Sequence, residues 1–384
     1  KRKNMIQFAD RLQTVQEYYF SKKLREVRSL ISLGKPIINI GIGSPDLEPS
    51  KVVITAIQSS LKDVNAHKYQ SYQGLPEFRK AVAGFYESKF NVHLDSESEV
   101  LPLMGSKEGI MHISLALLNE GDEVLIPNPG YPTYSSVSNL VGATSVFYNL
   151  DECTNYQPDF LALEKLDLSK VKLMWVNYPH MPTGTKANKN TFEQLISFGK
   201  KHNIVIVNDN PYSFILNDNP QSILEFEGAK EVALELNSLS KSFNMAGWRV
   251  GMLLGNENFI NQILKVKTQM DSGMFYGIQK GAIAALELSN DWFYQLNEIY
   301  QLRRKLIWEL AEKLNCTFDK NTSGMFVWAK LPKGKVSEEL VDELLYNKSI
   351  FVAPGTIFGS KGEGYIRFSL CISDDKIKEA ISRI

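Results

Sequence analysis

Ser238-Leu-Ser-Lys-Ser-Phe-Asn-Met-Ala-Gly-Trp-Arg-Val-Gly251 lies between two apolar runs of the chain, Val232 to Leu236 and Val250 to Leu254. The pattern predicts a polar loop between two buried strands. Loops that a rigid scaffold holds in this way often carry function. A lysine enclosed in such a loop loses hydration, which favours the neutral amine and makes it a nucleophile toward carbonyl carbon. Lys241 is therefore the first candidate for a reactive group.

Two hydroxyls, Ser238 and Ser240, precede this lysine, and Arg249 follows it. Taken singly, the lysine could be a solvated surface charge, the serines turn caps and the arginine a cover for a strand end. Together they suit a phosphate held beside a Schiff base. The order Ser-x-Ser-Lys followed by Ala-Gly-x-Arg-x-Gly resembles the lysine segment of the class I/II aminotransferases, the fold-type I enzymes that use pyridoxal 5'-phosphate. This resemblance implies that Lys241 forms the covalent link to the cofactor, while Ser238 and Arg249 bind its phosphate.

The composition is that of an ordinary globular protein. The 384 residues exceed what one core usually fills, which predicts a large domain and a smaller one. The 43 basic residues balance the 43 acidic ones, which argues against charge-driven binding to nucleic acid or membranes. No apolar run has the length of a membrane span, and Lys1 to Asp10 has no signal-peptide core. Cys153, Cys316 and Cys371 lie far apart, which favours a reducing cytoplasm, and the five scattered histidines predict no metal site.

The N-terminal part predicts a helix, a strand and a glycine loop. Apolar residues recur at helical spacing from Tyr18 to Leu33, and Gly34-Lys-Pro36 ends the helix. Ile37 to Ile40 is a short apolar strand that leads into Gly41-Ile-Gly-Ser-Pro-Asp46. Glycine lets backbone amides approach a ligand closely, although a glycine turn alone is weak evidence. The resemblance implies that this loop lies over the substrate, with the Gly43 amide near its carboxylate.

The segment Tyr69-Gln-Ser-Tyr-Gln-Gly-Leu-Pro-Glu-Phe-Arg79 joins an aromatic loop to a helix that Pro76 opens. On the local sequence, Tyr69 could simply pack beneath the loop. The resemblance implies instead that Tyr69 reaches the cofactor phosphate of a neighbouring subunit. Such a shared site requires a homodimer.

A phosphate-binding turn is predicted after the buried strand Val100 to Met104, because Gly105-Ser-Lys-Glu-Gly109 passes directly into the apolar helix Ile110 to Leu118. A helix N-terminus presents free amides and a positive dipole end to an anion. Neither the Walker nor the Rossmann glycine spacing occurs here. The resemblance places Ser106 and Lys107 on the cofactor.

Two further strand ends carry candidate cofactor contacts. Strand Glu123 to Pro127 leads to Tyr131, on a turn fixed by two prolines and a glycine. Strand Ile204 to Val207 leads to Asp209 and Tyr212. A tyrosine there could belong to the core, and an acid just past a strand often only caps a turn. The resemblance implies that Tyr131 stacks on the pyridine ring, Asp209 pairs with the ring nitrogen and Tyr212 donates to the phenolic oxygen.

The remainder is mostly helical from Glu257 to Leu314 and then alternates short strands and helices. In the last strand, Gly364 to Leu370, Arg367 lies on the face opposite its two apolar neighbours. A strand arginine is usually solvated or paired. The resemblance implies that Arg367 clamps the substrate α-carboxylate, for which its forked donors are suited.

Repeated strand, turn and helix units between about Ile37 and Leu288 predict an α/β fold with a mostly parallel sheet and crossover helices. Ligands of such sheets bind at the carboxyl ends of the strands, where Ser106, Tyr131, Asp209 and Lys241 all fall. We expect a cofactor-binding domain over residues 37–288 and a smaller α+β domain over residues 289–384, which the segment 1–36 joins.

The predicted function is reversible amino transfer between an amino acid and a 2-oxo acid. A carbon–sulfur β-lyase of the same fold is the nearest alternative, because the same carbanion serves both reactions. A non-catalytic sensor domain that binds the cofactor is a second, although this chain has no spare basic arm for DNA. The wording Gly105-Ser-Lys-Glu-Gly109 with Pro129-Gly-Tyr-Pro132 resembles the branch that contains LL-diaminopimelate aminotransferases and alanine, aspartate and methionine enzymes. We expect glutamate or 2-oxoglutarate as one of the two substrates.

One position departs from the family pattern. Relatives typically read Asn-Pro-Thr-Gly after a core strand, and the asparagine donates to the cofactor's phenolic oxygen; this chain has Met181 in His180-Met-Pro-Thr-Gly184. Methionine has no donor. The phenolate would rely on Tyr212, unless His180 or Asn177 replaces the missing amide, and a less stabilised phenolate holds the imine proton more strongly.

Overall fold

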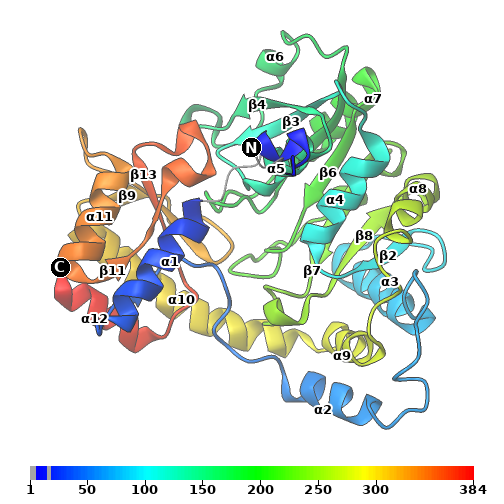
Figure 1. Ribbon diagram of the computed structural model, residues 1–384, viewed down its shortest axis with the longest axis horizontal. Coiled ribbons are helices and arrows are strands. Elements are labelled where there is room, and N and C mark those ends of the chain that lie inside the picture. Colours follow the sequence, from blue (N-terminus) through cyan, green and yellow to red (C-terminus); the bar gives the residue numbers. More distant parts are fainter. Residues whose placement is uncertain (1–5, 15–18) are drawn as a thin grey trace, which may run out of the picture.

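A seven-stranded sheet forms the centre of the larger part of the molecule, in the order β2-β8-β7-β6-β5-β3-β4. The computed structural model describes residues 6–14 and 19–384 (Figure 1). Among the strands described, only β8 runs opposite to the rest of this sheet. Its strands are β2 Val100–Leu103, β3 Glu123–Asn128, β4 Thr144–Asn149, β5 Val171–Val176, β6 Val205–Asp209, β7 Ala233–Ser238 and β8 Gly251–Gly255.

Helices cover both faces of this sheet, as the apolar strands require. Alternate residues of β5 enter different cores: Leu173 and Trp175 pack on one face, and Met174 and Val176 on the other. No helix among the described residues is long and apolar enough to cross a membrane. The helices of this part are α2 Lys51–Ser60, α3 Pro76–Phe90, α4 Ser106–Leu117, α5 Thr133–Leu140, α6 Phe160–Leu163, α7 Lys189–His202, α8 Glu257–Lys267 and α9 Tyr276–Leu286.

A four-stranded antiparallel sheet, in the order β12-β13-β10-β9, organises the C-terminal part. It has its own apolar core, to which α1 contributes Val27. Helix α1 lies against this part in Figure 1, and Lys23 donates to Asp342 of α11 at 2.7 Å. Its elements are α1 Tyr19–Ser32, α10 Asn290–Lys313, β9 Thr317–Phe318, β10 Phe326–Lys330, α11 Ser337–Lys348, β11 Ile350–Phe351, β12 Ala353–Pro354, β13 Tyr365–Ser369 and α12 Asp374–Arg383.

The first strand does not join the large sheet, which corrects the expected start of the repeated units at Ile37. Strand β1, Ile38–Asn39, pairs in parallel with β11, and Ile38 and Ile40 are buried in the C-terminal core. An apolar strand pattern indicates burial but does not specify a partner some 310 residues away. The pairing of β1 thus places Ile38 and Asn39 with the C-terminal part, and the expected boundary near residue 288 stays a prediction.

Other expected elements agree with the structure within a few residues. Tyr18, the expected start of the first helix, lies outside the described residues, and α1 begins at Tyr19. The edge strand β4 was not predicted, because most of its residues are exposed or half-buried and it lacks a continuous apolar run. Asp209 is the last residue of β6 rather than the start of the following turn.

Candidate active site

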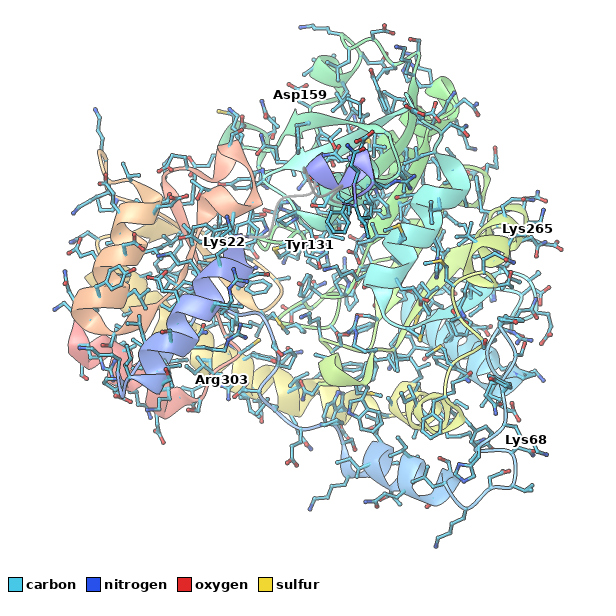
Figure 2. All side chains as sticks on the ribbon, in the orientation of Figure 1. Lys22, Lys68, Tyr131, Asp159, Lys265 and Arg303 are labelled. Atoms are coloured by element: carbon cyan, nitrogen blue, oxygen red, sulfur yellow. The ribbon has the colours of Figure 1, made fainter. Side chains whose placement is uncertain are left out.

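The carboxyl edge of the large sheet gathers the candidate residues from five separate strand ends. Ser106 follows β2, Tyr131 follows β3, Asn177 follows β5, Asp209 ends β6 and Lys241 follows β7. Strand β8 runs the other way, so its N-terminal end, preceded by Arg249, lies at the same edge. A cavity of about 430 Å³ is lined by all six side chains and by residues of the C-terminal part. In Figure 2, Tyr131 lies near the centre of the molecule, between its two parts.

Lys241 lies on the predicted loop between β7 and β8. The loop is pinned at its base by the amide of Leu239, which donates to the carbonyl of Val250 at 3.1 Å. The Nζ atom of Lys241 donates to the Gly43 carbonyl at 2.6 Å, so the glycine loop of the N-terminal part lies directly beside the amine. Desolvation lowers the pKa of Lys241; Arg367 and Arg249 act in the same direction, whereas Cys371 and Asp209 oppose it. The amine is thus prepared to act as a nucleophile and a base.

Asp209 presents one satisfied and one unsatisfied oxygen. Its Oδ2 atom accepts a hydrogen bond from the Tyr134 hydroxyl at 2.8 Å, and the Tyr134 ring stacks on Trp175 with centroids 4.9 Å apart. Its Oδ1 atom is buried and has no hydrogen-bond partner among the described residues. Burial raises the pKa of Asp209 to about 6. A buried carboxylate oxygen that lines a cavity without a donor fits a protonated ring nitrogen.

A phosphate-sized anion fits the part of the cavity where α4 begins. Ser106 and Lys107 of the first turn line the cavity, as do Ser238, Ser240 and Arg249 from the lysine loop. Cations, hydroxyls and a helix N-terminus together form a suitable phosphate site.

Two glycines allow the two phosphate-binding loops to meet. Gly105 has φ +85°, and a Cβ there would lie 2.2 Å from Nη2 of Arg249. At Gly251, a Cβ would lie 2.8 Å from the amide nitrogen of Ser106. Arg249 itself is held by the Ala246 carbonyl, to which its Nη1 donates at 2.9 Å. A larger side chain at either glycine would separate the loops.

Arg367 of β13 is the buried cation at the other end of the cavity. Its Nη2 donates to the Gly41 carbonyl at 2.8 Å, and its guanidinium carbon lies 3.9 Å and 4.6 Å from the ring centroids of Phe326 and Phe358. Burial lowers the pKa of Arg367 to about 10, so it stays charged at neutral pH. A desolvated, oriented guanidinium is suited to a carboxylate.

The glycine loop lies close to Phe326. A Cβ at Gly43 would lie 2.4 Å from the Phe326 ring, so only glycine permits this approach. Tyr131 and Tyr212 also line the cavity. The Tyr131 ring meets Tyr134 edge to face with centroids 5.5 Å apart. Burial raises the pKa of Tyr212, which keeps its hydroxyl protonated and able to donate.

Met181 also lines the cavity, and its Sδ atom lies 3.2 Å from Nη1 of Arg367. His180 is not among the residues that line it; its Nδ1 pairs with Thr183 Oγ1 at 2.8 Å, and burial lowers its pKa to about 3. Of the two alternatives to Tyr212, His180 therefore does not reach the cavity. Asn177 lines the cavity, but its Nδ2 donates to the Asp209 carbonyl at 2.6 Å and its Oδ1 accepts from the Met181 amide.

Tyr69 lies outside this cavity, and 91% of its surface is exposed. Its neighbour Lys68 lies at the periphery in Figure 2, away from Tyr131. The single chain thus brings together every predicted site residue except Tyr69. Reasoning from the sequence missed Tyr134, Phe326 and Phe358. The two phenylalanines have no polar motif around them, whereas the spacing from Tyr131 to Tyr134 at the start of a helix was an available signal.

Comparison with known proteins gives one result. The family model for aminotransferase class I and II matches residues 35–384. LL-diaminopimelate aminotransferase of Aquifex aeolicus is 39% identical over 382 residues, covering 99% of each chain, and that of Dehalococcoides mccartyi is 40% identical over 99% of this chain and 98% of its own.

Solved structures agree with this result. A substrate-bound BacF from Bacillus subtilis superposes with a TM-score of 0.94 at 34% identity, covering 99% of this chain and 97% of its own. A probable N-succinyldiaminopimelate aminotransferase from Thermus thermophilus gives 0.89 at 30% identity, covering 95% and 98%. The match over nearly the whole length, with a half-buried lysine, an unsatisfied aspartate and a candidate phosphate site in one cavity, shows that the chain belongs to the class I and II aminotransferases, enzymes that use pyridoxal 5'-phosphate.

Proposed function

We propose that this aminotransferase transfers the amino group of an LL-diaminopimelate-like amino acid to 2-oxoglutarate, which becomes glutamate. The names of relatives that are 38 to 40% identical over almost the whole chain support the first substrate. The observation that carries amino transfer itself is the juxtaposition of Lys241 and Arg367 in one cavity. An amine poised as a base and a fixed carboxylate-binding cation are what a reaction at an α-carbon needs.

Each residue has a proposed task. Pyridoxal phosphate, when bound, supplies an aldehyde carbon and an electron-withdrawing ring. Asp209 would hold the proton of the ring nitrogen at its Oδ1 atom, and Tyr212 would donate from its hydroxyl to the phenolic oxygen. Ser106, Lys107, Ser238 and Arg249 would bind the phosphate. Tyr131 would cover one face of the ring.

The substrate end is held by the chain's own groups. Arg367 would bind the α-carboxylate through its forked N–H donors, beside the amide of Gly43. This would orient the α-carbon toward Lys241, whose amine would take the α-proton and donate it to the cofactor carbon that receives the amino group. Leu24 and Ile42 line the cavity as well, and their apolar side chains help to exclude water.

The distal carboxylate of glutamate needs a further donor. Among the described residues, the lysines and arginines that line the cavity are Lys107, Lys241, Arg249 and Arg367, and each already has a proposed task. We infer that hydroxyl or amide groups, or the neighbouring subunit, bind that carboxylate.

A panel of amino donors tests the proposal. LL-diaminopimelate, aspartate, alanine and phenylalanine are each mixed with the holoenzyme and 2-oxoglutarate, and the formation of oxo acid and glutamate is measured. We expect LL-diaminopimelate to give the highest kcat/KM. Release of pyruvate and ammonia from a cysteine S-conjugate, without consumption of 2-oxoglutarate, would indicate a lyase instead.

Lys241→Ala is the reference variant for this panel. We expect its rate of amino transfer to fall by at least about 10³-fold, since general acid–base catalysis alone contributes about 10²–10⁴-fold. Lys265→Ala, a change of an exposed lysine on α8, is the matched control. A Lys241→Ala protein that keeps near wild-type transfer would rule out the assignment.

We further propose that the enzyme is a homodimer in which Tyr69 reaches the partner's phosphate site. The exposure of the Tyr69 side chain supports this arrangement. Other exposed apolar side chains do so too: Val64 and Tyr72 lie in the same segment, and Met270 lies shortly before Gly273, which packs against Gln70. Tyr69→Phe should weaken cofactor retention by about 1.5–3 kcal/mol, the worth of one charge-assisted hydrogen bond. Tyr294→Phe, another exposed tyrosine, is the control. A fully active monomer in sedimentation would contradict the shared site.

A further inference from the structure

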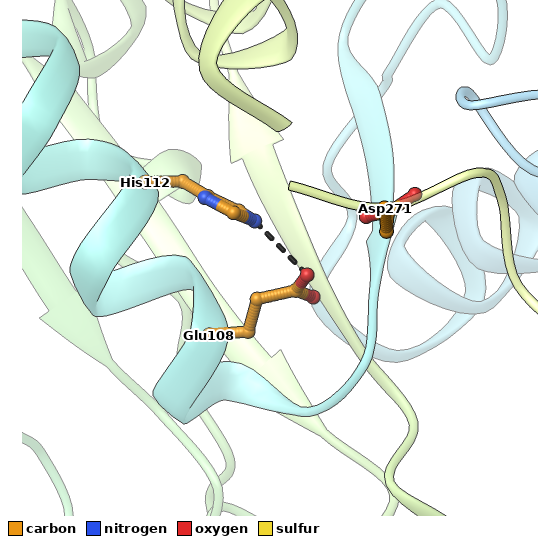
Figure 3. Close-up of side chains that lie close together, drawn as sticks. All are labelled: Glu108, His112 and Asp271. Atoms are coloured by element: carbon orange, nitrogen blue, oxygen red, sulfur yellow. Dashed lines mark ion pairs between the residues drawn. The ribbon is translucent and has the colours of Figure 1, made fainter. Parts of the chain in front are cut away.

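A second cluster of charged side chains lies outside the cavity, where α4 meets the segment that follows α8. Glu108 and His112 of α4 approach Asp271, and one ligand-capable atom of each lies within 4.8 Å of the others (Figure 3). Nε2 of His112 lies 3.0 Å from Oε1 of Glu108. None of the three side chains lines the active cavity. The cluster therefore needs an explanation of its own.

A metal ion is disfavoured in this cluster because a cation is already there. Lys267, whose side chain is 0% exposed, donates from Nζ to both oxygens of Asp271, at 2.9 and 2.7 Å. A metal ion beside that ammonium would bring two positive charges together in a buried place. The Lys267–Asp271 pair instead fixes the start of the segment that follows α8.

This segment supports the loop that carries Tyr69. Oδ1 of Asp271 accepts from the amide of Gly273 at 2.8 Å. Gly273 has φ +90°, and a Cβ there would lie 2.4 Å from the carbonyl oxygen of Gln70 and 3.0 Å from that of Ser71. The backbone of Gly273 therefore packs directly against the two residues that follow Tyr69.

Gln279 ties the same two segments together a second time. Its Oε1 atom accepts from the Leu75 amide at 2.7 Å, and its Nε2 donates to the Met274 carbonyl at 2.8 Å. On the other side of the cluster, Oε2 of Glu108 accepts from the Met104 amide at 2.6 Å, just before the phosphate-binding turn at Ser106. This largely half-buried cluster thus contacts both the turn that precedes Ser106 and the segment that packs against the Tyr69 loop.

We propose that Asp271, held by Lys267, and Gly273 are positioning residues that place Tyr69 for the phosphate site of the partner subunit. This inference rests on the proposed homodimer with a shared site. The pair neutralises its own charge, Asp271 fixes the Gly273 amide, and the glycine leaves room for the Gln70 carbonyl. The register of the Tyr69 loop against the large domain follows from these three contacts.

Gly273→Ala tests the last contact without changing a charge. The added methyl group displaces Gln70, and we expect the dissociation constant of pyridoxal phosphate to rise by about 10- to 100-fold, as for Tyr69→Phe. The kcat at saturating cofactor should stay near wild type. Gly334→Ala is the matched control, since Gly334 has φ +85° and a Cβ there would meet nothing within 4 Å, so it carries the same backbone strain without the contact.

The double variant Tyr69→Phe with Gly273→Ala separates the two proposals. If Gly273 acts through Tyr69, the double variant retains the cofactor as well as Tyr69→Phe alone does. Additive losses, or wild-type retention in Gly273→Ala, would overturn the positioning role. If Tyr69→Phe alone binds the cofactor normally, the shared site itself is wrong, whatever Gly273→Ala does.

Two further variants test the ion pair without leaving a buried charge unpaired. Lys267→Met with Asp271→Leu removes the acceptor of the Gly273 amide, and we expect the same loss of cofactor retention as in Gly273→Ala. Lys267→Met with Asp271→Asn keeps an acceptor oxygen and should retain the cofactor within about threefold of wild type. Equal retention by these two variants, at equal melting temperature, would contradict the role of Asp271.

Discussion

Two buried carboxylates on adjacent strands, Asp209 of β6 and Glu235 of β7, have different surroundings. The register pairs Asn208 with Glu235 and Asp209 with Leu236, so the two acids point to opposite faces of the sheet. Glu235 is 0% exposed and both of its oxygens are satisfied. Its donors are the Tyr86 hydroxyl, Nδ2 of Asn208 and of Asn210, and the Ile223 amide.

Asp209 is buried too, but its Oδ1 atom has no hydrogen-bond partner among the described residues. Burial raises the pKa of both acids, so burial alone does not separate them. The two acids differ in that Oδ1 of Asp209 lacks a hydrogen-bond donor. A satisfied buried carboxylate stabilises the fold, whereas an unsatisfied one on a cavity wall is available to a ligand.

Asp209→Asn should give the largest effect on this comparison. Without its charge, the ring-nitrogen proton loses its partner, and we expect kcat to fall by about 10²–10³-fold, as for the loss of one preorganised electrostatic contact. The melting temperature of the cofactor-free protein should not fall. Steady-state kinetics at saturating cofactor measures this, and a decrease of less than about fivefold would remove the distinction between the two acids.

The pH dependence of the cofactor-free protein should show the cost of burying the Asp209 carboxylate. The pKa of Asp209 in the folded state, about 6, lies above its ordinary value of 3.8, so the folded state binds the proton more tightly. The stabilisation is present below about pH 4 and is lost as the pH rises through 6, a decrease of about 3 kcal/mol.

Urea unfolding of the cofactor-free wild type and of Asp209→Asn at several pH values measures this difference. The variant has no carboxyl to titrate at this position, so its advantage over wild type should grow by that amount between about pH 4 and 7. A constant difference across this range would contradict the assigned surroundings of Asp209.

Glu235→Gln should reduce stability and leave kcat almost unchanged, the reverse of the result expected for Asp209→Asn. The glutamine side chain replaces one acceptor oxygen by an NH2 group, which cannot accept hydrogen bonds from the surrounding donors. We therefore expect a loss of about 1–3 kcal/mol in the free energy of unfolding. At saturating cofactor, kcat should change by less than about twofold. Glu227→Gln, outside the network, is the control for the loss of one charge. A large decrease in kcat with unchanged stability would place Glu235 in the active site instead.

Met181→Asn changes a residue that lines the cavity and should give the smallest effect of these variants. An asparagine at this position could donate to the cofactor's phenolic oxygen, so the pH at which the absorbance of the bound cofactor changes should fall, by up to about one unit for one hydrogen bond. Met181→Leu, which adds no donor, is the control. Identical titrations of Met181→Asn and wild type would mean that another donor, such as the second N–H of Asn177, already serves this oxygen.

The sequence alone was enough to bring together the candidate residues that follow the ends of parallel strands. In a parallel sheet all carboxyl ends lie at one edge, so Ser106, Tyr131, Asp209 and Lys241 could be placed together from their positions after apolar runs. The α/β class follows from the same repeated pattern. The lysine motif further predicted the family, which the comparisons show.

Only the tertiary structure decided which distant groups meet. The partner of Ile38 is Ile350, the donor to Asp209 is Tyr134, and the rings beside Arg367 come from two separate segments of the C-terminal part. No sequence motif indicated that Asp271 binds the Gly273 amide or that Gly273 packs against the Tyr69 loop. Local periodicity records how much each side chain is buried but not against what, because packing partners are chosen by the shape and charge of the whole chain.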